Sequence, residues 1–95
     1  MLVTLKEAQS ACDGIGRRIF YAGNPILVGL VQNYLLWRKT EFAQVWSSSP
    51  PGEILPVGTG IVTTFDFLES TVANAIALDE KKIMSVCLAG KDLRA

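Results

Sequence analysis

One run of thirteen residues, "PILVGLVQNYLLW" at positions 25–37, constrains this chain more than any other part of it. It is the most apolar stretch, although Gln32 and Asn33 lie inside it. A membrane-spanning helix needs about 20 apolar residues, so the run is too short for one. We therefore expect a nearly buried helix in a folded protein, and no membrane span.

The residues around this run predict a helix from about 25 to about 47. Asn24 and Pro25 suit the N-cap and the first turn, and "SSSPPG" ends the helix. On a helical wheel the apolar side chains of 25–47 cover an arc of about 200°. One partner helix cannot cover that arc, so we expect this helix to be covered from two sides, one of them by another subunit.

A second helix is predicted at the start of the chain. Thr4 and Glu7, in "TLKE", have the spacing of a capping box, in which each side chain pairs with the other residue's backbone N–H. Apolar residues recur at helical spacing behind them, with two glycines interrupting the pattern. This pattern predicts a helix over about 4–20, antiparallel to the helix at 25–47.

The second half of the chain also carries a helical spacing of apolar residues. Phe65, Leu68, Val72 and Ile76 form one stripe, which predicts a helix at 64–78. Asp79 lies on the same stripe and suits the N-cap of a further helix at 79–89.

The region between the predicted helices is irregular. The Pro- and Gly-rich segment at about 50–62 predicts a loop or a short β-hairpin, in which 54–62 forms the hairpin or an extended arm. The expected fold is therefore mainly α: a single domain, 1–95, built as a bundle of three to four helices.

Composition favours association with a protein partner. Hydrophobic residues make up 49% of the chain and charged residues 19%, against about 25% charged in typical domains. A chain of 95 residues has a modest core, so surplus apolar side chains tend to be buried against another subunit. We expect a homo-oligomer or a protein partner.

Charge and residue types count against other functions. Nine basic and nine acidic residues give no net charge, whereas nucleic-acid binding needs a basic surface. The chain has no histidine, the commonest general base and metal ligand. The sequence therefore favours a non-catalytic protein with no metal, no cofactor and no nucleic-acid partner.

Two cysteines, Cys12 and Cys87, lie far apart and lack metal-binding spacing. The first ten residues lack the basic and apolar regions of a signal peptide. We expect reduced core thiols in a cytoplasmic protein, with a disulfide in an oxidising compartment as the alternative.

The segment "YLLWRKTEFAQVW", positions 34–46, contains both tryptophans and supplies the candidate site. On a helical wheel Trp37 and Trp46 point in opposite directions, while Arg38 and Glu41 face each other. The pair is either exposed, buried at a subunit boundary, or part of a ligand pocket with Trp walls. The interface or ligand candidates are Tyr34, Trp37, Arg38, Glu41, Phe42 and Trp46.

These residues support two functions. The preferred one is a small structural subunit that makes protein–protein contacts, self-associating through the helix at 25–47. The alternative is a small-molecule binding module with an apolar cavity lined by Trp37, Trp46 and Arg38. A separate candidate anion site is "GIGRR", with Arg17 and Arg18, although it lacks the phosphate-loop pattern and also fits a solvated basic patch.

Overall fold

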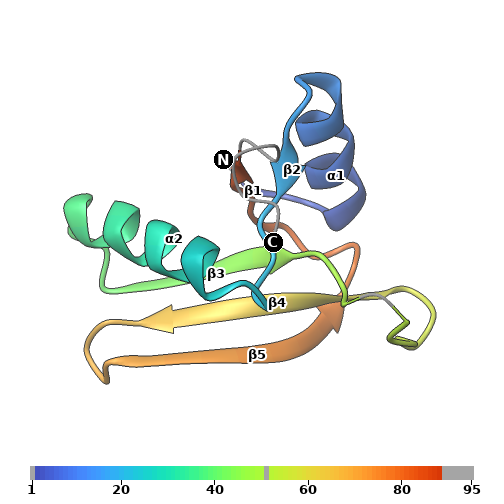
Figure 1. Cartoon of the computed structure of the whole chain (residues 1–95). Helices are drawn as coiled ribbons and strands as arrows, with labels where there is room; N and C mark the ends of the chain where they lie inside the picture. The colour runs from blue at the N-terminus through green and yellow to red at the C-terminus, as the bar shows by residue number, and fades with distance from the viewer. Residues whose placement is uncertain (1, 51, 89–95) are drawn as a thin grey trace.

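The computed structural model in Figure 1 describes residues 2–50 and 52–88 and contains two helices and two β-sheets in these ranges. The elements in chain order are β1 (Leu2–Val3), α1 (Leu5–Gly14), β2 (Arg18–Ile19), α2 (Pro25–Trp37), β3 (Phe42–Ser47), β4 (Thr59–Asp66), β5 (Thr71–Leu78), β6 (Ile83–Met84) and β7 (Cys87–Leu88). The expected mainly α bundle is therefore wrong, because the chain mixes helices with extended strands.

The larger sheet has five strands in the order β1-β6-β3-β4-β5. β3, β4 and β5 form an antiparallel meander, and β6 runs parallel to β3. β2 and β7 pair separately as a small antiparallel sheet. The two edges of the larger sheet are thus the two-residue strand β1 and the eight-residue strand β5.

The predicted start of the first helix is confirmed, but its end is not. The Thr4 hydroxyl accepts from the Glu7 N–H, and a Glu7 carboxylate oxygen accepts from the Thr4 N–H. The helix ends at Gly14, and Gly16 follows with φ of 69°. The N–H groups of Gly16 and Arg17 donate back to Asp13 and Cys12, which closes a Schellman motif. The glycines terminate the helix rather than interrupt it.

The second helix begins as predicted, with Asn24 as N-cap and Pro25 at its first position. It ends at Trp37, ten residues before the predicted end at 47. Lys39 has φ of 58°, and the N–H groups of Lys39 and Thr40 donate to Leu36 and Leu35. This is again a Schellman motif, with lysine where glycine is usual. A left-handed lysine carries no sequence signal, which is why the end was missed.

The helices predicted at 64–78 and 79–89 are wrong as well. Positions 64–66 belong to β4 and 71–78 form β5, while β6 and β7 occupy part of 83–88 and residue 89 lies outside the described residues. Between β4 and β5, the Asp66 carboxylate accepts from two backbone N–H groups of the turn, and Ser70 has φ of 56°. Val72, Ile76 and Leu78 alternate with alanines along β5, a period of two that the helical spacing masked.

The helices cover different parts of the sheet. Cross-strand pairing places Ala43, Phe65 and Val72 on one face, and Ala43 and Phe65 pack in a core with Leu27, Val31 and Leu35 of α2. We call this the α2 face; in Figure 1, α2 lies along β3. The opposite face carries a second core, in which Trp46 and Val62 pack with Ala8 of α1. We call it the α1 face.

The two cysteines form a disulfide, so the expectation of reduced thiols is wrong. The two sulfurs of Cys12 and Cys87 lie 1.97 Å apart, and their Cα atoms are 5.3 Å apart. The bond connects α1 to β7 across 75 positions of sequence. Sequence spacing did not reveal it, because the fold alone brings these positions together.

Neither of the two described helices has the length and apolar character needed to cross a membrane.

Candidate functional site

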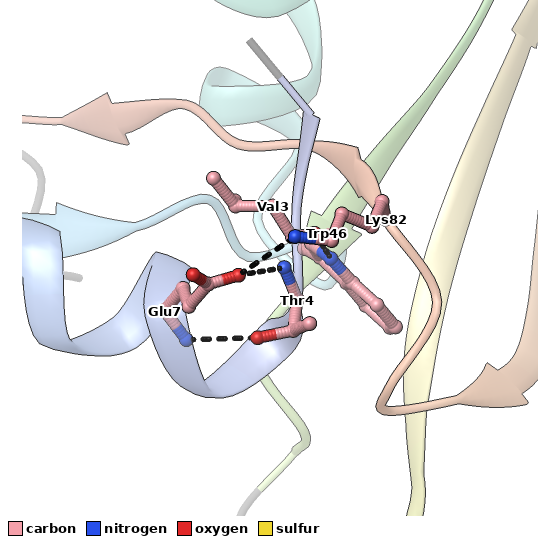
Figure 2. Close-up of polar contacts among 5 residues, drawn as sticks. All are labelled: Val3, Thr4, Glu7, Trp46 and Lys82. Atoms are coloured by element: carbon pink, nitrogen blue, oxygen red, sulfur yellow. Dashed lines mark hydrogen bonds and ion pairs between the residues drawn. The ribbon is translucent and has the colours of Figure 1, made fainter.

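The structure separates the two tryptophans of the candidate site. Trp46 lies fully buried in β3 on the α1 face, where its indole N–H donates to the carbonyl of Val3 at 2.8 Å (Figure 2). Trp37 is the last residue of α2 and is 79% exposed. They lie on different elements and in different surroundings, so they do not enclose a common cavity.

Arg38 pairs with Tyr34 rather than with Glu41. The guanidinium donates to the Tyr34 hydroxyl at 2.8 Å and lies 5.6 Å from the centre of its ring. Because α2 ends at Trp37, Arg38 and Glu41 do not share a helix face, and they form no ion pair. Phe42 begins β3 and is 57% exposed on the α1 face, where its cross-strand partner is Asp66. Of the six candidates, only Tyr34 and Arg38 come together.

A groove of about 600 Å³ lies between the C-terminal half of α2 and residues 84–88. Tyr34 and Arg38 lie on its α2 side, and Met84, Val86 and Leu88 line the opposite side. The remaining lining residues are Leu30, Val31, Leu35, Thr40, Ser85 and Cys87. The part of the groove that residues 2–50 and 52–88 line is thus mainly apolar with a single cation, and neither tryptophan lines it.

The outward side of α2 bears an apolar stripe. Ile26, Leu30, Tyr34 and Trp37 recur at helical spacing and are all exposed. Leu27, Val31 and Leu35 occupy the adjacent buried side. The fold of the single chain covers one side of this helix, which is also shorter than expected. Its coverage on a second side by another subunit stays a prediction.

Arg17 and Arg18 do not form a defined site. Arg17 follows the turn at the end of α1, and Arg18 lies in β2 opposite Leu88. Both side chains are exposed. The exposure of both side chains fits the solvated basic patch, which was the alternative to an anion site.

Sequence reasoning missed two surfaces. One is the outer edge of β5, which was assigned to a helix. The other is the loop at 52–58, where Ile54 is 94% exposed and Val57 is fully exposed. The prolines and glycines of 50–62 predicted a loop or a short β-hairpin; residues 52–58 form a loop, whereas 59–62 belong to the long strand β4. Only the structure shows that apolar side chains of the loop lie in solvent.

The carboxylate of Glu7 lies at the start of α1, beside Thr4 and Lys82 (Figure 2). Hydrogen bonds from the backbone N–H and then the hydroxyl of Thr4, followed by the charge of Lys82 at 3.9 Å, lower the pKa of the Glu7 carboxyl. These interactions stabilise the start of α1. In residues 2–50 and 52–88, His, Cys, Asp and Glu form no cluster of three or more that could hold a metal ion.

No protein-family model, curated protein or solved structure matches the chain.

Proposed function

We propose that this protein is an assembly subunit without catalytic activity, which self-associates by pairing the outer edge of β5 with β5 of a second copy. The observation that supports this is the character of the strand. Thr71–Leu78 is an edge strand of eight residues with no charged residue and no proline. Exposed edges are usually protected by charge, proline, bulges or short length, because unpaired backbone groups recruit other strands.

The hydrogen-bond pattern identifies which backbone groups face outward. Phe67 N–H donates to the Glu41 carbonyl, which extends the pairing of β3 with β4. Because bonded pairs alternate, odd-numbered residues of β4 bond to β3 and even-numbered ones to β5. The bond from Asp79 N–H to the Gly58 carbonyl agrees with this alternation. The odd-numbered residues of β5 therefore bond to β4, and the even-numbered ones point outward.

The outward-facing residues are Val72, Asn74, Ile76 and Leu78. The Leu78 carbonyl already accepts from Lys81 N–H, so the fully open groups belong to the other three. A two-fold axis at Asn74 pairs Val72 with Ile76 of the second copy and satisfies the N–H and C=O groups of all three. An axis at Ala75 would instead require the occupied carbonyl of Leu78. We therefore expect the register centred on Asn74.

Side chains support the same register. Val72, Asn74 and Ile76 lie on the α2 face of the sheet, because their cross-strand partners are Phe65, Thr63 and Ile61. A two-fold perpendicular to the sheet would place Val72 beside Ile76 of the second copy, on the same face. Both side chains are exposed in the single chain and would be partly covered in the pair.

The test is to add charge to the edge. Ile76 is 56% exposed, so Ile76→Lys should leave the fold intact while placing an ammonium group beside the partner's Val72. We expect the dimer affinity to fall about tenfold or more, which corresponds to about 1.4 kcal/mol or more. Sedimentation equilibrium measures the affinity, and circular dichroism checks the fold.

Ile26→Lys is the matched control, because it adds the same charge to the exposed stripe of α2. It should leave the dimer unchanged. Dissociation by Ile26→Lys with no effect of Ile76→Lys would instead place the contact on α2 and contradict edge pairing. A protein that is monomeric at every concentration would contradict self-association altogether.

Cross-linking tests the register. Asn74→Cys places two thiols opposite each other at the two-fold axis, where paired Cα atoms are about 5.5 Å apart and within disulfide reach. Thr71→Cys is the control, since the same register places its copies about 20 Å apart along the strands. Oxidation should yield a covalent dimer of the first variant only.

The disulfide is evidence about the cellular compartment in which the protein resides. Disulfides persist in oxidising compartments, so the Cys12–Cys87 bond favours such a compartment over the predicted cytoplasm. Alkylating free thiols before extraction from the producing cells, followed by mass spectrometry, would distinguish the two. Complete alkylation of both cysteines would show that the thiols are free in the cell, and would therefore indicate a reducing compartment.

A further inference from the structure

The loop at 52–58 and the groove beside α2 have complementary properties. The loop presents Ile54 and Val57 to solvent, and Glu53 directly precedes Ile54 in sequence. The groove has apolar walls, and Arg38 is the only charged residue among the described residues that line it. Neither Glu53 nor Arg38 forms an ion pair among the described residues.

We infer that this loop of one protomer docks in the groove of a neighbouring protomer, with Ile54 and Val57 against its apolar walls and Glu53 beside Arg38. The occupant of the groove is thus a second copy of the chain. Two exposed aliphatic side chains and an aliphatic groove each lose contact with water, and the opposite charges fix the orientation.

The loop at 52–58 and the groove lie too far apart in one chain to contact each other, so the contact must join two protomers. The loop follows the end of β3, whereas Arg38 and Thr40 precede its start. The six residues of β3 span about 20 Å. In Figure 1 the loop projects beyond one end of the sheet, and the C-terminal end of α2 lies toward the other end. A loop therefore cannot reach the groove of its own chain, and the contact is head-to-tail.

Tyr34 prepares the groove for a carboxylate. Its hydroxyl accepts from one guanidinium nitrogen of Arg38 at 2.8 Å, and its ring lies beneath the guanidinium. Because arginine has five N–H donors, the remaining ones stay available for the two oxygens of Glu53. Tyr34 thus restricts the orientation of the cation before the loop arrives.

A head-to-tail contact has a different consequence from edge pairing. The β5 contact is two-fold and closes on itself, whereas a loop-in-groove contact repeats and generates rings or filaments. The inference goes beyond the proposed function, since it involves neither β5 nor its backbone groups. The two contacts can therefore be tested separately.

Charge reversal in the Ile76→Lys background isolates the head-to-tail contact. Glu53→Arg and Arg38→Glu each place like charges together, and each should weaken association about tenfold. An equimolar mixture of the two variants should associate as strongly as the parent, because every loop then meets a groove of opposite charge. One chain carrying both substitutions should also recover. For each variant and for the mixture, light scattering over a concentration series measures the average mass and hence the strength of association.

The apolar part of the contact has its own test. Ile54→Ser and Val57→Ser remove exposed side chains, so folding should be unaffected while association falls about tenfold for each. Leu68→Ser is the control, because Leu68 is also aliphatic and is 75% exposed but lies in the turn between β4 and β5. It should leave association unchanged.

The outcomes separate this inference from edge pairing. If Ile76→Lys yields monomers at every concentration and wild type is a dimer, edge pairing stands and loop docking is overturned. If Ile76→Lys associates like wild type and the charge reversals act as expected, loop docking stands alone. Saturable binding of dodecanoate to an Ile76→Lys monomer would overturn it in favour of a small-molecule groove.

Discussion

β4 and β5 are hydrogen-bonded neighbours of equal length, yet half of the residues of β4 are buried and none is exposed, whereas seven of the eight residues of β5 are exposed. The difference does not come from their apolar content. β4 has a strand on each side and a helix packed over each face, whereas β5 has one neighbouring strand and lies beyond α2. Position in the sheet decides burial, so an apolar strand at the edge keeps solvent-exposed surface that a second chain could cover.

The largest expected effect comes from truncating the same face on the two strands. Phe65 and Val72 are cross-strand partners, but Phe65 is fully buried beside the rings of Phe20 and Phe67. Phe65→Ala should lower the free energy of unfolding by about 3–5 kcal/mol. Val72→Ala should cost less than about 1 kcal/mol in the monomer, because the side chain is already exposed. Urea denaturation below the dimer concentration measures both, and equal losses would contradict the comparison.

The disulfide secures α1, the helix that covers part of β4. Replacing Cys12 and Cys87 by serine should destabilise the fold by about 2–4 kcal/mol, since the bond restricts a long loop in the unfolded chain. Reduction of the wild type should produce a similar loss. Fluorescence of buried Trp46 should shift first as α1 loosens, whereas a dimer contact at β5 should survive. An unchanged unfolding midpoint after reduction would contradict this role.

A polar contact joins the buried strand to the exposed one. The hydroxyl of Thr63, which is buried, donates to the side-chain oxygen of Asn74 at 2.7 Å. Asn74→Ala should cost about 1–3 kcal/mol, because it leaves the hydroxyl without a partner. The double variant Thr63→Val with Asn74→Ala should recover most of this loss. Thermal unfolding at low concentration provides the measurement, and additive losses would show that the contact contributes nothing.

The smallest effect concerns the cap of α1. Thr4→Ala removes the capping box and should cost about 1 kcal/mol. The pKa of Glu7 is lowered in the folded state, so its contribution to stability is present above the unfolded pKa and is lost as pH falls through the folded pKa. Acid titration of the unfolding free energy should show this loss in the wild type. Glu7→Gln keeps a capping side chain without a charge and should not show it.

Local signals predicted the beginnings of elements better than their ends or their type. The caps at Thr4 and Asn24 were readable because each places a side-chain oxygen near the N–H groups of the next turn. The end of α2 was not, because Lys39 adopts a left-handed conformation that glycine usually marks. The β5 strand was misassigned because Val72 and Ile76 satisfy both a helical and an alternating spacing.

The candidate site was predictable only in part. Tyr34 and Arg38 lie four residues apart on one helix, so local geometry brings them together. The walls formed by Met84, Val86 and Leu88 come from a distant segment, and no local pattern indicates that they face α2. The outward groups of β5 required the register of three strands. The proposed contacts therefore rest on pairings that lie outside any one segment.

By itself the sequence determined where two helices begin and that the chain carries more apolar side chains than a small core needs. Tertiary structure decided that 42–47 and 71–78 are strands, that Cys12 meets Cys87, and which apolar residues remain in solvent. The physical reason is the distance along the chain over which each interaction acts. Caps act over one helical turn, whereas strand pairing, disulfide formation and burial depend on residues far apart in the chain.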